Sequence, residues 1–147
     1  MKVNHLAPQF VERFPDKLEP GELYLAMEFA TAAHLCACGC GTKVITPFSP
    51  TDWQMSFDGE NVSIKPSVGN WTFPCRSHYW VRSGQIEWSG DMSQEAINAG
   101  RKRDALAKAR LQTIWPVDDE IRYSTPTQQV QPKAPSWSEK LRKWFGL

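Results

Sequence analysis

Four cysteines constrain this chain more than any other feature. Three of them alternate as Cys36, Cys38 and Cys40, and the fourth, Cys75, follows about 35 residues later. Disulfides within the first three would close very tight rings, and the N-terminus carries no signal-peptide pattern. Thiolate sulfur suits zinc, and a structural zinc site needs four such ligands. The sequence therefore predicts a zinc ion held by all four, with reduced cysteines packed as small hydrophobic residues as the alternative.

The surroundings of these cysteines leave one ligand choice open. His78 stands in a C-x-x-H spacing with Cys75, so it competes as a zinc ligand. Gly39 and Gly41 permit the tight turns of a ligand-bearing loop. Because C-x-C-x-C differs from the C-x-x-C knuckle of zinc ribbons, we expect an unusual loop.

Composition excludes several classes of protein. The net charge is +1, so no field of one sign draws the whole chain to nucleic acid. Hydrophobic residues make up 41% of the chain, and none of its apolar runs reaches the roughly 20 residues of a spanning helix. Together with the absence of a signal peptide, this predicts a cytoplasmic protein without a specific nucleic-acid partner.

Short apolar runs bounded by turn residues predict a β-rich domain. The expected strands cover residues 22–27, 43–48, 52–57, 61–65, 78–82 and 85–89. Asp58-Gly59 and Ser83-Gly84 are turn signals between neighbouring strands and predict two hairpins.

A helix is expected after these strands. Residues 91–94 read as a helix start, and alanine and long straight side chains follow, which predicts a helix over 93–114. Its basic residues alternate with acidic ones and indicate a solvated face. The fold class is thus α+β: a small zinc-stapled antiparallel β domain with two hairpins, one following helix and a short C-terminal amphipathic helix.

The domain organisation follows from shifts in composition. We expect an N-terminal arm over 1–20, the zinc-binding domain over 21–122, a Pro/Gln-rich linker over 123–135 and an amphipathic tail helix over 136–147. One face of the tail carries Trp137, Leu141, Trp144 and Phe145. So short a helix needs a surface to dock on, and a partner or the parent domain is favoured over an anionic membrane.

Polar residues near the cysteines suggest acid–base chemistry. His34, His78, Ser67 and Ser77 are candidate catalytic residues, since a serine nucleophile needs a neighbouring base. Successive side chains on a strand point to opposite faces, so Ser77 and His78 should not bond each other. The pairs left open are Ser67 with His78 and Ser77 with His34.

Hydrogen-bond donors that could stabilise a negatively charged substrate oxygen lie close to Ser67 in the sequence. Gly69 and Asn70 follow Ser67 and are candidate oxyanion or positioning groups. The structural alternative is that these serines and histidines are turn hydroxyls, core groups or partners of the metal ligands.

Two sequence blocks carry a family resemblance. HLCACGCG at 34–41 and VSIKPSVGNWTFPCRSHYWV at 62–81, followed by a G-x-[IV]-x-W strand at 84–88, resemble the bacterial and phage domain-of-unknown-function family 6527. The resemblance covers residues 20–90. Ala37 stands where the family pattern has proline, which bears only on loop rigidity.

The resemblance implies a component of bacterial ubiquitin-like conjugation operons, encoded beside E1-like and E2-like proteins. It implies peptidase activity on the ubiquitin-like modifier, with the four cysteines as metal ligands and the two serines and two histidines in the active site, without assigning their roles. The expected function is a zinc-binding serine-type peptidase that processes or removes the modifier. The alternative is a non-catalytic zinc-stapled adapter of the same or a phage-related system.

Overall fold

Residues 1–114 are described in a computed structural model of the chain. The elements in order are β1 (Ala7–Phe10), β2 (Glu22–Ala26), the 3-10 helix η1 (Met27–Phe29), β3 (Thr31–Leu35), β4 (Lys43–Pro47), β5 (Gln54–Phe57), β6 (Val62–Gly69), β7 (His78–Arg82), β8 (Gln85–Trp88) and α1 (Gln94–Ile114). Met1–Leu111 form one compact unit. The expected linker and tail helix lie outside the described residues.

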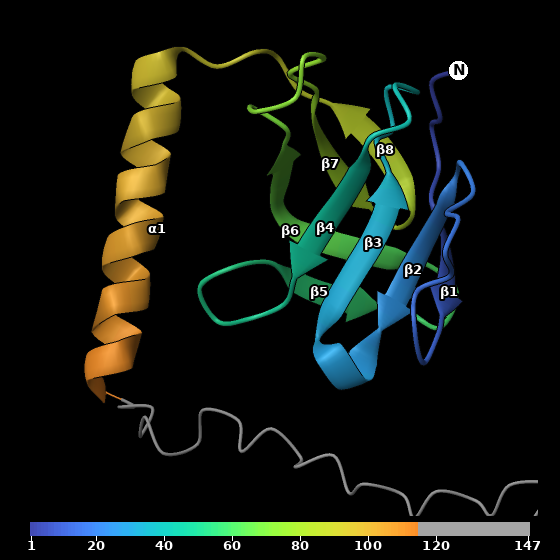
Figure 1. Cartoon of the computed structure of the whole chain (residues 1–147), viewed down its shortest axis with the longest axis horizontal. Coiled ribbons are helices and arrows are strands. Elements are labelled where there is room, and N and C mark those ends of the chain that lie inside the picture. Colours follow the sequence, from blue (N-terminus) through green and yellow to red (C-terminus); the bar gives the residue numbers. More distant parts are fainter. Residues whose placement is uncertain (115–147) are drawn as a thin grey trace, which may run out of the picture. The chain divides into compact units, whose positions relative to one another are not determined.

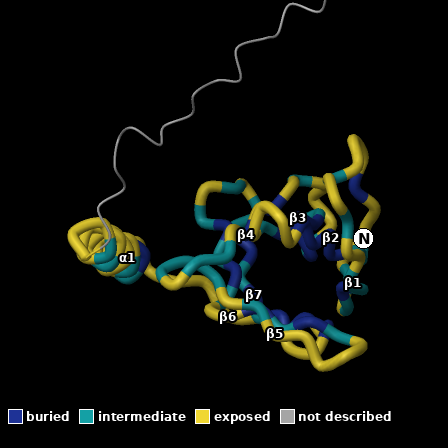
Figure 2. Tube along the Cα trace, turned by 90° about the horizontal axis from the view of Figure 1, so that it is seen from below, coloured by how far each residue is buried: buried dark blue, intermediate teal, exposed yellow. Residues whose placement is uncertain are grey.

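The strands form two four-stranded sheets, ordered β1-β2-β3-β4 and β5-β6-β7-β8 (Figure 1). Among the strand pairs within residues 1–114, β1–β2 alone is parallel. Isolated bridges join the sheets at both edges, between His5 and Gln85 and between Phe48 and Trp53. Buried residues lie between the two layers of strands (Figure 2). The expected α+β class with an antiparallel-rich β domain is confirmed.

Both expected hairpins are present. β5 and β6 pair on either side of Gly59, whose φ is 105°. β7 and β8 are joined by Ser83 and Gly84, with φ of 42° and 76°. Two consecutive positive φ values are what a type I′ hairpin requires.

Two strands escape the sequence pattern. β3 is alanine-rich, and Ala32 and Ala33 are both fully buried because one faces the main core and the other a second cluster with Leu18 and Tyr24. A strand buried on both faces shows no alternation. β1 arises within the expected arm, where Pro8 pairs with Leu23 at the edge of the sheet.

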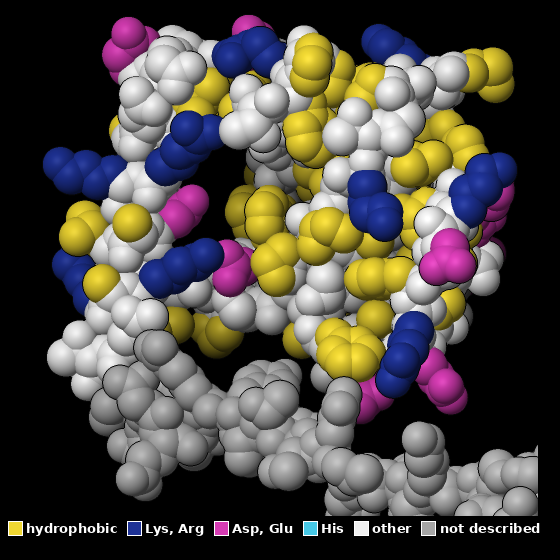
Figure 3. All heavy atoms as spheres, viewed as in Figure 1, with side chains coloured by type: hydrophobic (Ala, Val, Ile, Leu, Met, Phe, Trp, Pro, Cys, Tyr) yellow, Lys and Arg dark blue, Asp and Glu magenta, His cyan; other side chains and the backbone are white. Residues whose placement is uncertain are grey.

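The helix α1 begins one residue after the expected start. Ser93 Oγ accepts the N–H of Ala96 at 3.3 Å, so Ser93 caps the helix. Ile97 is the only buried residue of α1, and charged side chains line the helix in Figure 3. No helix within residues 1–114 is long and apolar enough to cross a membrane.

Candidate active site and metal centre

Ser67 and His78 meet on the outer face of the second sheet. Their strand neighbours Val68 and Tyr79 are buried register partners, and Gly69 pairs with His78. Because side chains alternate along a strand, Ser67 and His78 project away from the core. His78 Nε2 lies 2.9 Å from Ser67 Oγ.

The second nitrogen of His78 fixes the direction of this hydrogen bond. Nδ1 lies 2.9 Å from the carbonyl oxygen of Gly90, which can only accept. Nδ1 therefore carries the hydrogen, and Nε2 of the neutral ring offers a lone pair to the Ser67 hydroxyl. A serine, its base and a group that orients the base are the parts of a nucleophilic site.

Two side chains flank the imidazole. The Trp71 ring packs on the His78 ring with centroids 4.8 Å apart, and the Arg76 guanidinium lies 5.7 Å from the centre of the Trp71 ring. A Cβ at Gly69 would overlap the Trp71 indole. Glycine at this position therefore lets the indole lie close to the strand beside Ser67.

A pocket of about 320 Å³ adjoins Ser67. Trp53 and Trp71 supply aromatic wall, and the first turns of α1 supply Ala96 and Gly100. Trp53 Nε1 also donates to the Ser67 carbonyl at 3.4 Å. The volume falls within the range of roughly 300–1,000 Å³ that ligand pockets occupy.

The four cysteine sulfurs lie within 4.8 Å of one another. Cys36 Sγ is 3.4 Å from Cys38 Sγ and 4.0 Å from Cys75 Sγ, and the Cys40 and Cys75 sulfurs are 3.8 Å apart. A disulfide would bring two sulfurs to about 2.05 Å. Four sulfurs at about 2.3 Å around a tetrahedral ion stand about 3.8 Å apart. The cluster therefore has the dimensions of a metal site.

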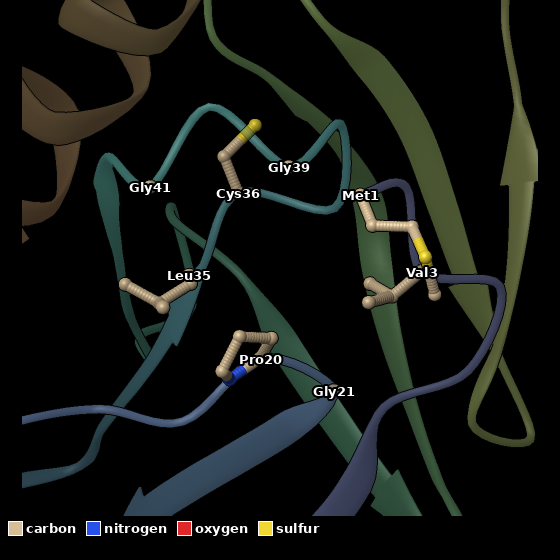
Figure 4. Close-up of a pocket in the computed structure, with 8 residues that line it drawn as sticks. All are labelled: Met1, Val3, Pro20, Gly21, Leu35, Cys36, Gly39 and Gly41. Atoms are coloured by element: carbon tan, nitrogen blue, oxygen red, sulfur yellow. The ribbon is translucent and has the colours of Figure 1, made fainter.

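Three of these cysteines lie on the connection between β3 and β4. Gly39 and Gly41 have φ of 86° and 77°, which lets this loop curl tightly. A Cβ at Gly39 would overlap the backbone of Met1, which lies beside the loop in Figure 4. Val3 N–H donates to the Ala37 carbonyl at 2.9 Å, so the N-terminal segment braces the loop.

Ser77 and Asn70 face this cluster. Ser77 Oγ lies 3.0 Å from Cys36 Sγ, and Asn70 Nδ2 donates to Ser77 Oγ at 2.8 Å. Because Ser77 Oγ already accepts from the amide, its own hydrogen is free to point at the sulfur. Burial raises the pKa of Cys36, and the Ser77 contact opposes that rise. The Thr42 hydroxyl and backbone lower the pKa of Cys40 to about 6.

His34 lies inside the molecule. It is fully buried, and its Nε2 is 2.8 Å from the Tyr79 hydroxyl. Burial lowers the pKa of His34 to about 4, so the ring is neutral. Its Nδ1 has no hydrogen-bond partner within residues 1–114.

The structure thus brings together some of the residues singled out from the sequence and separates others. Ser67 and His78 are paired, whereas Ser77 bonds the cysteine cluster and His34 bonds Tyr79. The Asn70 amide points to the cluster and not to Ser67. Both ring nitrogens of His78 are engaged elsewhere, which leaves the metal cluster to the cysteines.

Sequence reasoning missed three contributors to the site. Gly90 acts through its carbonyl oxygen, which every residue possesses, so the sequence holds no signal for it. Trp71 and Arg76 lie within the block that carries the family resemblance, but their contacts depend on the turn between β6 and β7.

Comparison with known proteins bears on both centres. No curated protein and no solved structure matches the chain significantly. Residues 10–89, more than half of the chain, match a family described as the bacterial ubiquitination-like system serine protease (BubE). The matched span contains Ser67, His78 and all four cysteines, and the expected relation to bacterial ubiquitin-like operons is confirmed. The chain therefore belongs to the BubE family of bacterial ubiquitination-like systems.

Proposed function

We propose that this protein is a serine peptidase that processes or removes the ubiquitin-like modifier of its pathway, with Ser67 as nucleophile and His78 as base. The observation that carries the proposal is the 2.9 Å contact between Ser67 Oγ and His78 Nε2, in a ring whose other nitrogen donates to Gly90. The description of the matching family, a serine protease of a bacterial ubiquitination-like system, supports this reaction and this class of substrate.

The chemistry follows from this pair. His78 Nε2 takes the hydroxyl proton as Ser67 Oγ attacks the carbonyl carbon of the scissile peptide bond. The protonated ring then gives that proton to the leaving amine as the C–N bond breaks, leaving an acyl-enzyme. Water, deprotonated by the same nitrogen, releases the carboxylate product and restores Ser67.

The cysteine cluster has a structural part in this proposal. Zinc is the ion we assign to Cys36, Cys38, Cys40 and Cys75, because four thiolates in a tetrahedral arrangement are its preferred structural ligand set. Such an ion ties the β3–β4 loop to Cys75, which precedes β7. E1-like and E2-like proteins are the partners that this pathway implies.

Cleavage of a modifier fusion tests the function. The substrate is a ubiquitin-like modifier with a C-terminal peptide extension, incubated with the full chain and followed by mass spectrometry. Ser67→Ala and His78→Ala should each lower the rate by a factor on the order of 10³ or more, because nucleophile and base act as one unit.

Ser63→Ala is the matched control. Ser63 lies on β6 as Ser67 does, and its Oγ accepts the Ser83 N–H at 2.8 Å. This variant should cleave as the unchanged protein does. Binding of the fusion without any cleavage, or full cleavage by Ser67→Ala, would contradict the proposal.

A further inference from the structure

The carbonyl that orients His78 belongs to a short connection with little packing of its own. Gly90 lies between the end of β8 and the start of α1, and a Cβ placed on it would meet nothing within 4 Å. Apolar contacts therefore do not hold this carbonyl at His78 Nδ1. The Ser89 N–H donates to the His78 carbonyl at 2.9 Å and restrains the residue before Gly90, and polar contacts of the next two residues restrain the other side.

Arg76 makes those contacts. Its Nη2 donates to Asp91 Oδ1 at 2.9 Å and its Nε to Asp91 Oδ2 at 3.4 Å, which is a two-point contact. The same Nη2 reaches the Met92 carbonyl at 3.3 Å. The guanidinium thus fixes both residues that follow Gly90.

The guanidinium also restrains the aromatic ring that packs on the imidazole. It lies over Trp71, and Trp71 packs on His78. One cation therefore restrains the loop that contacts His78 Nδ1 and the ring that covers the imidazole. Arg76 has a φ of 44°, a left-handed backbone that costs energy for any residue except glycine.

We infer that Arg76 is a positioning residue that acts through Asp91 and Gly90 to keep His78 in the form that accepts the Ser67 proton. This inference rests on the proposed Ser67–His78 pair. Without the clamp, Gly90 moves away from Nδ1, the hydrogen of the imidazole is shared between its two nitrogens, and Nε2 is less often free to accept.

The charge of Asp91 serves the same end. Arg76 holds the pKa of this carboxyl below its usual range, helped by the Met92 N–H. The carboxylate therefore stays negative and keeps its two-point contact with Arg76.

The solvent exposure of the Arg76–Asp91 ion pair indicates that it adds little to the stability of the fold. The Arg76 and Asp91 side chains are 38% and 64% exposed, and exposed ion pairs contribute little to folding. Arg76→Gly removes the clamp and relieves the left-handed backbone. This variant should therefore keep or raise the melting temperature while it slows the chemistry.

The test measures how fast a fluorophosphonate reacts with Ser67. The serine oxygen attacks phosphorus, fluoride leaves, and His78 takes the proton, so the rate reports activation of the serine without a peptide substrate. Arg76→Gly and Asp91→Asn should lower the rate about 10- to 100-fold, as small displacements of catalytic groups do. Arg76→Lys should fall in between, since ammonium cannot make the two-point contact.

Arg82→Ala is the control. Arg82, on β7, pairs with Glu87 at 3.3 Å and lies 5.1 Å from the centre of the Trp80 ring, so it makes the same two kinds of contact as Arg76. Its rate should be unchanged. Imidazole ¹⁵N chemical shifts of His78 should show hydrogen on Nδ1 in the unchanged protein and a mixture in Arg76→Gly.

The outcomes are distinguishable. No labelling of Ser67 in the unchanged protein overturns the proposed function itself. Labelling of Ser67 at equal rates in the unchanged protein and Arg76→Gly overturns the positioning role alone. A rate loss in Arg76→Gly that comes with a lower melting temperature and unaltered His78 shifts also overturns it, because Arg76 would then act on stability.

Discussion

Ser77→Ala separates the two centres most sharply. Ser77 is adjacent to His78 in sequence, yet it is only 7% exposed and its hydroxyl serves the cysteine cluster. Ser67 instead projects outward to His78. We expect Ser77→Ala to lower the stability of the fold and the affinity for metal while Ser67 stays reactive. Ser67→Ala should abolish the reaction and leave stability and metal affinity almost unchanged.

The magnitude follows from the contacts that disappear. Ser77→Ala removes the acceptor 2.8 Å from Asn70 Nδ2 and the hydroxyl 3.0 Å from Cys36 Sγ, and the amide is left with the sulfur at 3.6 Å. A buried polar group that loses its partner costs about 1–3 kcal/mol. At roughly 4–5 °C per kcal/mol for a domain of this size, the melting temperature should fall by roughly 5–15 °C.

Metal affinity should fall as well. Loss of a hydrogen bond to a metal ligand typically lowers affinity by about 10- to 100-fold. Competition with a chromophoric chelator measures this change, and circular dichroism follows unfolding of the zinc-loaded protein. Ser67→Ala should change the free energy of unfolding by no more than about 0.5 kcal/mol, as outward-facing substitutions do.

One result would refute the reasoning outright. If Ser77→Ala kept its melting temperature and zinc affinity but lost cleavage, and Ser67→Ala cleaved normally, Ser77 would be the nucleophile. The assignment of the two serines would then be reversed.

Three further perturbations have defined outcomes. Cys75→Ser should abolish stoichiometric zinc in elemental analysis and unfold the β domain at a lower temperature, because structural zinc contributes about 10–16 kcal/mol of apparent binding energy. Gly69→Ala should push the Trp71 ring from its place, cost about 1–3 kcal/mol of unfolding free energy and slow the fluorophosphonate reaction. Lys108 Nζ lies 2.6 Å from Asp52 Oδ1 and lowers the pKa of that carboxyl. The ion pair therefore stabilises the fold at neutral pH, and this stabilisation is lost as the pH falls through the lowered pKa. Lys108→Met should raise the Asp52 pKa in an NMR titration and move acid unfolding to higher pH.

Local signals made much of the fold predictable. Turn residues with positive φ marked the hairpins at Gly59 and Gly84, and an alanine-rich run marked α1. The clustering of the four cysteines could be predicted from thiol chemistry, since thiolates are preferred ligands of a structural metal ion. Strand alternation excluded a bond between Ser77 and His78 and left two pairs open, Ser67 with His78 and Ser77 with His34.

Tertiary contacts decided the remainder. The sequence of β3 shows no alternation of apolar and polar residues because both of its faces are buried. The parallel β1–β2 pair cannot be recognised from a hairpin turn, because parallel strands are not joined by one. Whether Ser67 or Ser77 meets a histidine depends on which face of the sheet is covered. The group that orients His78 is a backbone carbonyl, for which no residue type is diagnostic.

The two centres are built from the same pair of segments. Residues 67–70 carry the proposed nucleophile Ser67 and, at the other end, Asn70, which supports the cysteine cluster. Residues 75–78 carry the proposed metal ligand Cys75, its neighbour Ser77 and the proposed base His78. Asn70 N–H donates to the Ser77 carbonyl at 2.9 Å, and Gly69 pairs with His78, so the segments cannot slide independently. A one-residue slip would turn His78 inward and Ser77 outward, which disrupts both centres at once. A metal ion that holds Cys75 against the β3–β4 loop therefore also fixes the register in which His78 meets Ser67.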